Sequence, residues 1–207
     1  MLGLGSNMMK HPVTGKSIVR DGLVLQHNYN LSSVEPLSSG AASFNGTSDY
    51  IAINAKPVDT ADATYAWWSN STQTASQTIF SHGTSNAIGT FHVIYGTSNK
   101  PLLRLNTSLF QYWDDTGFAD DGKWHHWAVV VDVDDMTACK LYCDGVEIPQ
   151  SIRVTSEAAA SYGNMVIGKD DDANEFDGYM CNFGVWSSHL SQAQVKSIMN
   201  KNYDSLS

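Results

Sequence analysis

The sequence is short of charge, and of basic residues in particular. Only 16% of its 207 residues are charged, and 12 Lys and Arg stand against 21 Asp and Glu, which gives a formal net charge of −9. Nucleic acid needs a basic surface to neutralise its phosphates, so this balance argues against DNA or RNA as a partner. Glutamate is scarce as well, since only four of the 21 acids are Glu. Because Asp favours turns and Glu favours helices, the ratio favours an all-β chain.

Long apolar runs are also lacking. No stretch approaches the roughly 18 apolar residues of a membrane-spanning helix, so no membrane insertion is expected. Residues 1–16 contain no apolar core of signal-peptide length. There is no Gly-rich phosphate loop and no dinucleotide fingerprint, which leaves no sequence signal for a nucleotide cofactor.

Cysteine is rare, and its spacing suits neither a local bridge nor a zinc motif. Cys139 and Cys143 lie on one expected strand, roughly 13 Å apart, which is too far for a disulfide. The segment also lacks zinc-site spacing and a second ligand pair. A bridge to Cys181 would need neighbouring strands. We expect three small buried thiols in a reducing compartment.

Short strands and turns make up most of the chain. From residue 41 onward, apolar or alternating segments recur about every ten residues, with Asn-Gly, Asp-Gly or Asp-Asp turns between them, which is typical of a β-sandwich or barrel. The expected strands are 22–30, 41–44, 49–53, 63–69, 77–83, 90–96, 101–106, 108–113, 121–133, 138–148, 164–168 and 176–186. One helix is expected at 189–202, where Ser191 and Gln194 have the spacing of a capping box.

The stretch DGKWHHWAVVVDV, residues 121–133, raises the question of an active site. Successive side chains of a strand face opposite ways, so His125 and His126 cannot act together on one ligand. Apolar residues on both faces predict a strand that is covered on both sides. Asp132 and Asp134 would stand roughly 6–7 Å apart, near the spacing of glycosidase carboxylates. Asp is also common where a strand enters a hairpin turn, and we prefer that interpretation.

Three ordered motifs resemble the laminin-G-like, concanavalin A-like jelly rolls over roughly residues 22–203. They are a strand with an F-x-G turn and a D-Y pair, a G-x-W-H-H strand, and an I-G…F-x-G segment followed by Trp, Leu-Ser and a short helix. The matching residues are Phe44, Gly46, Asp49, Tyr50, 122–126, Ile167, Gly168, Phe176, Gly178, Trp186, Leu190 and Ser191. The resemblance implies an all-β, two-sheet antiparallel jelly-roll sandwich over 21–207 with one short C-terminal helix. Residues 1–20 lack clean periodicity and are expected to form a separate N-terminal arm.

The resemblance implies binding more than catalysis. The glucanase branch carries Glu-x-Asp-x-Glu or a close relative on one strand, and this chain has none, so it is not expected to be an enzyme. Many members bind Ca²⁺ through loop acids. The candidate calcium ligands here are Asp49, Asp170, Asp171, Asp172, Glu175 and Asp177. The alternative is that the acidic loop is simply solvated.

A sugar would need exposed aromatic faces with a few polar groups in a concave site. The candidate platforms are Trp68, Tyr95, Tyr112 and Trp113. The alternative is that these rings pack in the core or at its rim.

Two functions fit the resemblance. The first is a virion structural protein of a bacteriophage, either a capsid decoration or a tail-associated subunit, because the short chain and its N-terminal segment look like the lectin-fold structural proteins of marine phages. Such a subunit would assemble in the host cytoplasm, dock onto other virion proteins through residues 1–20, form homo-oligomers and could hold host glycans. The second is a Ca²⁺-dependent carbohydrate-binding or adhesion module.

Overall fold

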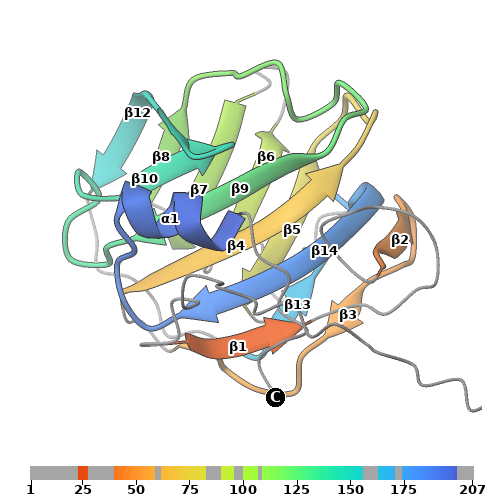
Figure 1. Ribbon diagram of the computed structural model, residues 1–207, viewed down its shortest axis with the longest axis horizontal. Helices are drawn as coiled ribbons and strands as arrows, with labels where there is room; N and C mark the ends of the chain where they lie inside the picture. The colour runs from red at the N-terminus through yellow and green to blue at the C-terminus, as the bar shows by residue number, and fades with distance from the viewer. Residues whose placement is uncertain are drawn as a thin grey trace, which may run out of the picture.

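A computed structural model describes residues 23–27, 40–58, 62–82, 90–95, 100–106, 109–155, 163–170 and 174–199. These residues form two antiparallel sheets packed face to face, with one helix on the outside (Figure 1). The predicted all-β sandwich with a short C-terminal helix is therefore confirmed. The predicted arm, residues 1–20, lies outside the described residues. In the described part of the chain, no helix has the length and apolarity needed to cross a membrane.

The first sheet contains the long strands at the centre of the sandwich. Its members are β1 (Leu23–His27), β2 (Ala42–Asn45), β4 (Ala63–Asn70), β9 (His125–Val131), β10 (Lys140–Cys143), β11 (Val146–Ile148) and β14 (Asp177–Trp186). They run in the order β1-β14-β4-β9-β10-β11, and β2 pairs with β14. Strands far apart in sequence are thus neighbours: β14, near the end of the chain, pairs with β1, β2 and β4.

The second sheet packs against the first. Its members are β3 (Ile51–Ala52), β5 (Gln77–His82), β6 (Thr90–Tyr95), β7 (Lys100–Asn106), β8 (Leu109–Trp113), β12 (Gln150–Thr155) and β13 (Met165–Ile167), in the order β12-β8-β7-β6-β5-β13-β3. The sequence analysis missed β12. This strand starts after Pro149 and lies at the sheet edge, the position where a nearby proline is tolerated.

Aromatic rings from both sheets fill the space between them. The ring centroid of Trp67 in β4 lies 5.3 Å from that of Phe91 and 6.1 Å from that of Phe183. Tyr65 stacks on Phe80 across the sheets at 4.3 Å. Each of these large rings removes more apolar surface from water than a smaller side chain would. They therefore supply much of the stability of the sandwich.

β9 answers the question that its sequence raised. Trp127, Val129 and Val131 belong to the core between the sheets, whereas Ala128 and Val130 belong to a second cluster on the outer face of the first sheet. All seven residues of the strand are buried. The prediction of a strand covered on both sides is confirmed, and the two histidines face opposite ways.

The helix α1 (Gln192–Met199) covers that outer face. Its buried Val195 and Ile198 share a cluster with Ala128, Val130, Tyr142, Trp186 and others. The predicted capping box is present: the backbone N–H of Ser191 donates to Oε1 of Gln194 at 2.8 Å, and the N–H of Gln194 donates to Oγ of Ser191 at 3.4 Å.

Candidate functional site

The first and third sequence motifs meet at one corner of the sandwich. The rings of Phe44 and Phe176 contact each other edge to face, with centroids 5.6 Å apart. The backbone N–H of Gly46 donates to the carbonyl of Phe176 at 3.1 Å, and the N–H of Phe176 donates to that of Gly168 at 2.8 Å. These contacts tie β2 to the segment between β13 and β14, so the motif residues build a rigid corner.

Two glycines of these motifs stand where a side chain cannot fit. Gly168 has a φ of +91°, and a Cβ there would lie 2.5 Å from the Phe44 ring. Gly178 has a φ of +142°, and its Cβ would overlap the carbonyl oxygen of Asn70. Both positions therefore need glycine for backbone conformation and for close approach.

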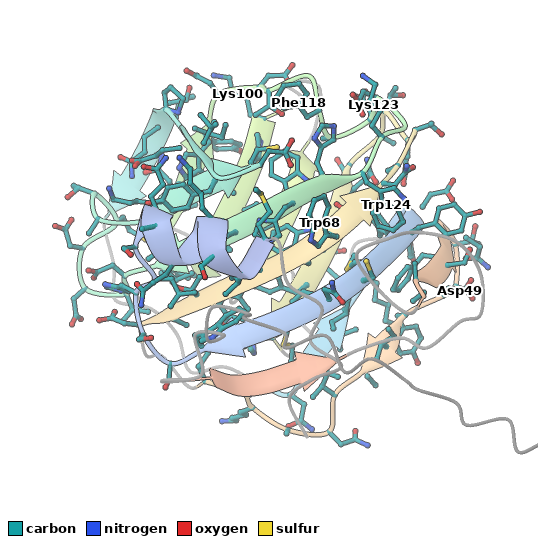
Figure 2. All side chains as sticks on the ribbon, in the orientation of Figure 1. Asp49, Trp68, Lys100, Phe118, Lys123 and Trp124 are labelled. Atoms are coloured by element: carbon teal, nitrogen blue, oxygen red, sulfur yellow. The ribbon has the colours of Figure 1, made fainter. Side chains whose placement is uncertain are left out.

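A tight turn at this corner presents the D-Y pair. The side-chain oxygen of Asn45 accepts the backbone N–H groups of Thr47, Ser48 and Asp49 at 3.0, 2.9 and 3.2 Å. This Asx-type turn fixes the chain between β2 and β3. Beside it lies a shallow pocket of about 400 Å³, which we call the corner pocket; its lining residues are Ala42, Ser43, Phe44, Ser48, Asp49, Tyr50 and Ile51. Figure 2 shows Asp49 at this edge of the molecule, beside β2.

The corner pocket combines an exposed ring with charged and hydroxyl groups. Tyr50 keeps 48% of its surface exposed, and the ammonium of Lys169 lies 3.7 Å from the centre of its ring. The side chain of Asp49 is exposed beside it. Tyr179, which is 51% exposed, is the cross-strand partner of the lining residue Ser43. An aromatic face with a carboxylate, an ammonium and hydroxyls is an arrangement suited to a polyhydroxylated ligand.

Asp170, one of the predicted calcium ligands, is used inside the protein. It is only 5% exposed, and its carboxylate accepts hydrogen bonds from Oγ1 of Thr78 at 3.0 Å and from Nδ2 of Asn174 at 3.0 Å. The N–H of Thr78 in turn donates to the carbonyl of Asn174 at 2.8 Å. The carboxylate thus anchors the loop after β13 to β5.

The other predicted calcium ligands do not gather around it. Among the described His, Cys, Asp and Glu side chains, two groups of three have ligand atoms that all lie within 4.8 Å of one another, and neither group includes Asp49, Asp170, Glu175 or Asp177. Asp171 and Asp172 lie outside the described residues. Calcium binding by this set remains a prediction, and its geometry is not assembled by the described part of the chain.

The four predicted sugar platforms do not form one surface. Trp113 is fully buried in the core, so its prediction as a platform was wrong. Because side chains alternate along a strand, Trp113 faces inward and the half-buried Tyr112 faces outward. Trp68 lies half-buried on the first sheet, where its ring contacts His126 at 5.4 Å (Figure 2). Tyr95 lies in β6, and its side chain is outside the described residues.

Of the two carboxylates considered for catalysis, that of Asp132 stabilises a turn. Oδ1 of Asp132 accepts the backbone N–H groups of Asp134 at 3.1 Å and of Asp135 at 2.7 Å. This is the hairpin-turn role that the sequence favoured.

Within the described part of the chain, neither ring nitrogen of His126 has a hydrogen-bond partner. Burial lowers the pKa of His126 to about 3, although the nearby Asp144 charge acts to raise it. A group that stays neutral and inaccessible at ordinary pH does not serve as an acid–base catalyst.

The comparisons agree with the fold. The chain belongs to the Concanavalin A-like lectin/glucanases superfamily, whose family model matches residues 45–196. This confirms the resemblance drawn from the three motifs. A comparison with the curated proteins finds no match.

Several solved structures are similar in fold. Domain 4 of AbnA, a GH43 extracellular arabinanase from Geobacillus stearothermophilus, solved in complex with arabinotriose, is 18% identical with a TM-score of 0.57, over 76% of this chain and 75% of that one. The botulinum neurotoxin serotype D/C binding domain is 13% identical with a TM-score of 0.61, over 86% of this chain and 52% of that one. The binding domain of Paraclostridial Mosquitocidal Protein 1 is 11% identical with a TM-score of 0.58, over the same shares. The chain thus spans about half the length of these toxin domains, and the likeness is one of fold.

Proposed function

We propose that this protein is a non-catalytic carbohydrate-binding module whose ligand occupies the corner pocket. The observation that carries the proposal is the exposed ring of Tyr50, which lies in a concave site beside the Asp49 carboxylate. The pocket, at about 400 Å³, falls within the usual range of small-ligand sites, roughly 300–1,000 Å³.

The groups at the pocket match the chemistry of a sugar. The apolar face of a pyranose or furanose ring stacks on an aromatic ring, and its hydroxyls pair with charged or hydroxyl side chains. Lys169 lies over one face of the Tyr50 ring, and 48% of the surface of this residue stays exposed. Asp49 would accept hydrogen bonds from sugar hydroxyls, and such charge-assisted bonds are stronger than neutral ones.

The chemistry of the pocket supports binding without hydrolysis. Hydrolysis of a glycosidic bond generally uses two carboxyl groups that flank the scissile bond. Among the residues that line the pocket, Asp49 is the single acid. We therefore propose that the bound glycan leaves unchanged.

The solved neighbours suggest which ligands to try first. The AbnA domain was solved with arabinotriose, and another neighbour, botulinum neurotoxin type C, is described as entering cells through two ganglioside molecules. Arabino-oligosaccharides and gangliosides are therefore the first probes for this chain.

The test is a glycan-array screen of the purified chain that includes these probes, run with Ca²⁺ and again with a chelator. We expect binding that falls at least tenfold in Tyr50→Ala and in Asp49→Asn. The matched control is Tyr112→Ala, which removes a half-buried tyrosine of β8 that does not line the pocket and should bind as the parent does. Loss of binding in the control alone, or no binding to any glycan, would refute the proposal. Loss of binding with the chelator would show that calcium takes part.

The larger setting of the module is a separate proposal. We propose that the protein is a structural subunit of a bacteriophage virion and that residues 1–20 dock it onto its neighbours. The support is the resemblance of the chain to lectin-fold structural proteins of phages. Removal of residues 1–20 should abolish association with particles while glycan binding persists; unchanged association would contradict the docking role.

A further inference from the structure

A group of side chains with metal-ligand chemistry lies on the rim of the sandwich, away from the corner pocket. Ligand atoms of His125, Cys143 and Asp144 all lie within 4.8 Å of one another. His125 begins β9, Cys143 ends β10, and Asp144 opens the turn to β11. Figure 2 shows the neighbouring Phe118 and Lys123 along the same rim, well separated from Asp49.

We propose that His125, Cys143 and Asp144 bind a Zn²⁺ ion, with Asp121 as the residue that orients the histidine. Nδ1 of His125 faces Oδ2 of Asp144 at 2.7 Å, so this nitrogen and this carboxylate point to one spot. The opposite ring nitrogen, Nε2, lies 3.2 Å from Oδ1 of Asp121. A histidine that binds a metal through one nitrogen usually donates the other N–H to a carboxylate, as this arrangement allows.

Surrounding contacts hold each of these groups in place. The ring of Phe118 stacks on that of His125, with centroids 4.9 Å apart. Oδ1 of Asp144 accepts the backbone N–H of His126 at 2.9 Å, which leaves Oδ2 for the site. The backbone of Asp144 is in the left-handed region, with φ of 49°, and its N–H donates to the His126 carbonyl at 2.8 Å.

Asp121 is held in position by contacts with Lys123. The backbone N–H of Lys123 donates to its Oδ1 at 2.9 Å, and the Lys123 ammonium lies 3.1 Å from its Oδ2. A charged carboxylate behind Nε2 strengthens the histidine as a ligand.

The distances fit a tetrahedral ion after a small adjustment. Zinc bonds of about 2.0–2.3 Å at tetrahedral angles place neighbouring ligand atoms roughly 3.3–3.6 Å apart. The distance of 2.7 Å between His125 Nδ1 and Asp144 Oδ2 must increase to admit the ion. The Asp144 side chain can move, because it is 42% exposed. The Cys143 sulfur, within 4.8 Å of both, must approach.

The ligand types select the metal. A thiolate and an imidazole suit Zn²⁺ and similar transition ions, whereas Ca²⁺ and Mg²⁺ take oxygen ligands. Burial raises the pKa of the Cys143 thiol. The ion must therefore displace the thiol proton to solvent as the metal–sulfur bond forms. Three protein ligands leave the fourth position to water, and the ion would join β9 to the β10–β11 turn.

The experiment is a titration of the chelator-treated full chain with Co²⁺, followed by displacement with Zn²⁺ in a calorimeter. Cobalt replaces zinc in such sites and gives a thiolate charge-transfer band in the near ultraviolet. We expect the band at one equivalent, its loss in Cys143→Ser, and its retention in Cys181→Ser, which removes a buried thiol elsewhere. Asp121→Asn should keep the band and weaken zinc about 10–100-fold.

Each outcome decides the proposal. Absence of the band and of zinc uptake in the parent chain would overturn it, and would leave His125 as a purely structural ion-pair partner of the two aspartates. Retention of the band in Cys143→Ser would overturn it as well, because another thiol would then be the ligand. If Cys143→Ser fails to fold, Asp144→Asn at the exposed turn serves instead, and unchanged zinc affinity in that folded variant would count against the site.

Discussion

At the scale of single residues, His126 shows how burial determines charge. Its imidazole is 1% exposed on the outer face of the first sheet, against the ring of Trp68, and has no hydrogen-bond partner among the residues that the structure describes. An unpaired charge in such a place would be costly, so the folded protein keeps the ring neutral.

This burial predicts a pH-dependent stability. The pKa of His126 is about 3 in the folded protein against an ordinary value of 6.5. Between these values the unfolded chain binds a proton that the folded chain does not. The free energy of unfolding that depends on neutral His126 is therefore fully present above pH 6.5 and decreases as the pH falls toward 3. The expected slope is on the order of 1 kcal/mol per pH unit. Urea unfolding at several pH values should show a flatter profile for His126→Phe, and an unaltered profile would contradict this account. His189→Gln, at an exposed histidine, is the control.

Gly178 is the residue where backbone conformation and space are both restrictive. Gly178→Ala should reduce the free energy of unfolding by about 3 kcal/mol or more, because its Cβ would overlap the carbonyl of Asn70 at a φ of +142°. Gly117→Ala is the matched control, with a φ of +65° and nothing within 4 Å, and should cost about 1 kcal/mol. Chemical denaturation measures both, and equal losses would show that the overlap is relieved by a small shift.

At the scale of elements, the strands and the helix were predictable where a local pattern decides them. The alternation in β9 and the capping box of α1 both depend on neighbouring residues, and both were predicted correctly. β12 was missed because it is a short edge strand that begins directly after Pro149, and because its partner β8 lies far back in the sequence. Trp113 was misassigned because sequence alone does not say which face of β8 is inside.

The helix cap offers a test at this scale. Ser191→Ala should lower the free energy of unfolding by about 1 kcal/mol, because the N–H of Gln194 loses its acceptor. Ser197→Ala within the same helix is the control and should change stability little or raise it slightly, since Ala is the better helix former. Thermal unfolding of the three proteins measures the difference, and equal stability of Ser191→Ala and the parent would show that the cap is dispensable.

At the scale of the whole molecule, the sandwich brings together what the sequence keeps apart. The corner pocket was not predicted as such: Asp49 was a candidate calcium ligand and Tyr50 was noted only as a motif residue, and the folded chain places both in the lining of one pocket. The rim group could not be found from spacing, because His125 and Cys143 come from different strands that pair only in the folded sheet. The predicted calcium set stays a prediction: its described members do not gather in one group of ligand atoms, and Asp171 and Asp172 lie outside the described residues.

The most direct test of the central claim is to map the ligand on the protein by solution NMR. A uniformly ¹⁵N-labelled sample is titrated with the strongest glycan from the array, and the backbone amide shifts are followed. The account predicts shifts concentrated at residues 42–51 and at Lys169, with little change on the outer face of the second sheet around Tyr112. Shifts centred on that second face, with none at the corner pocket, would contradict it.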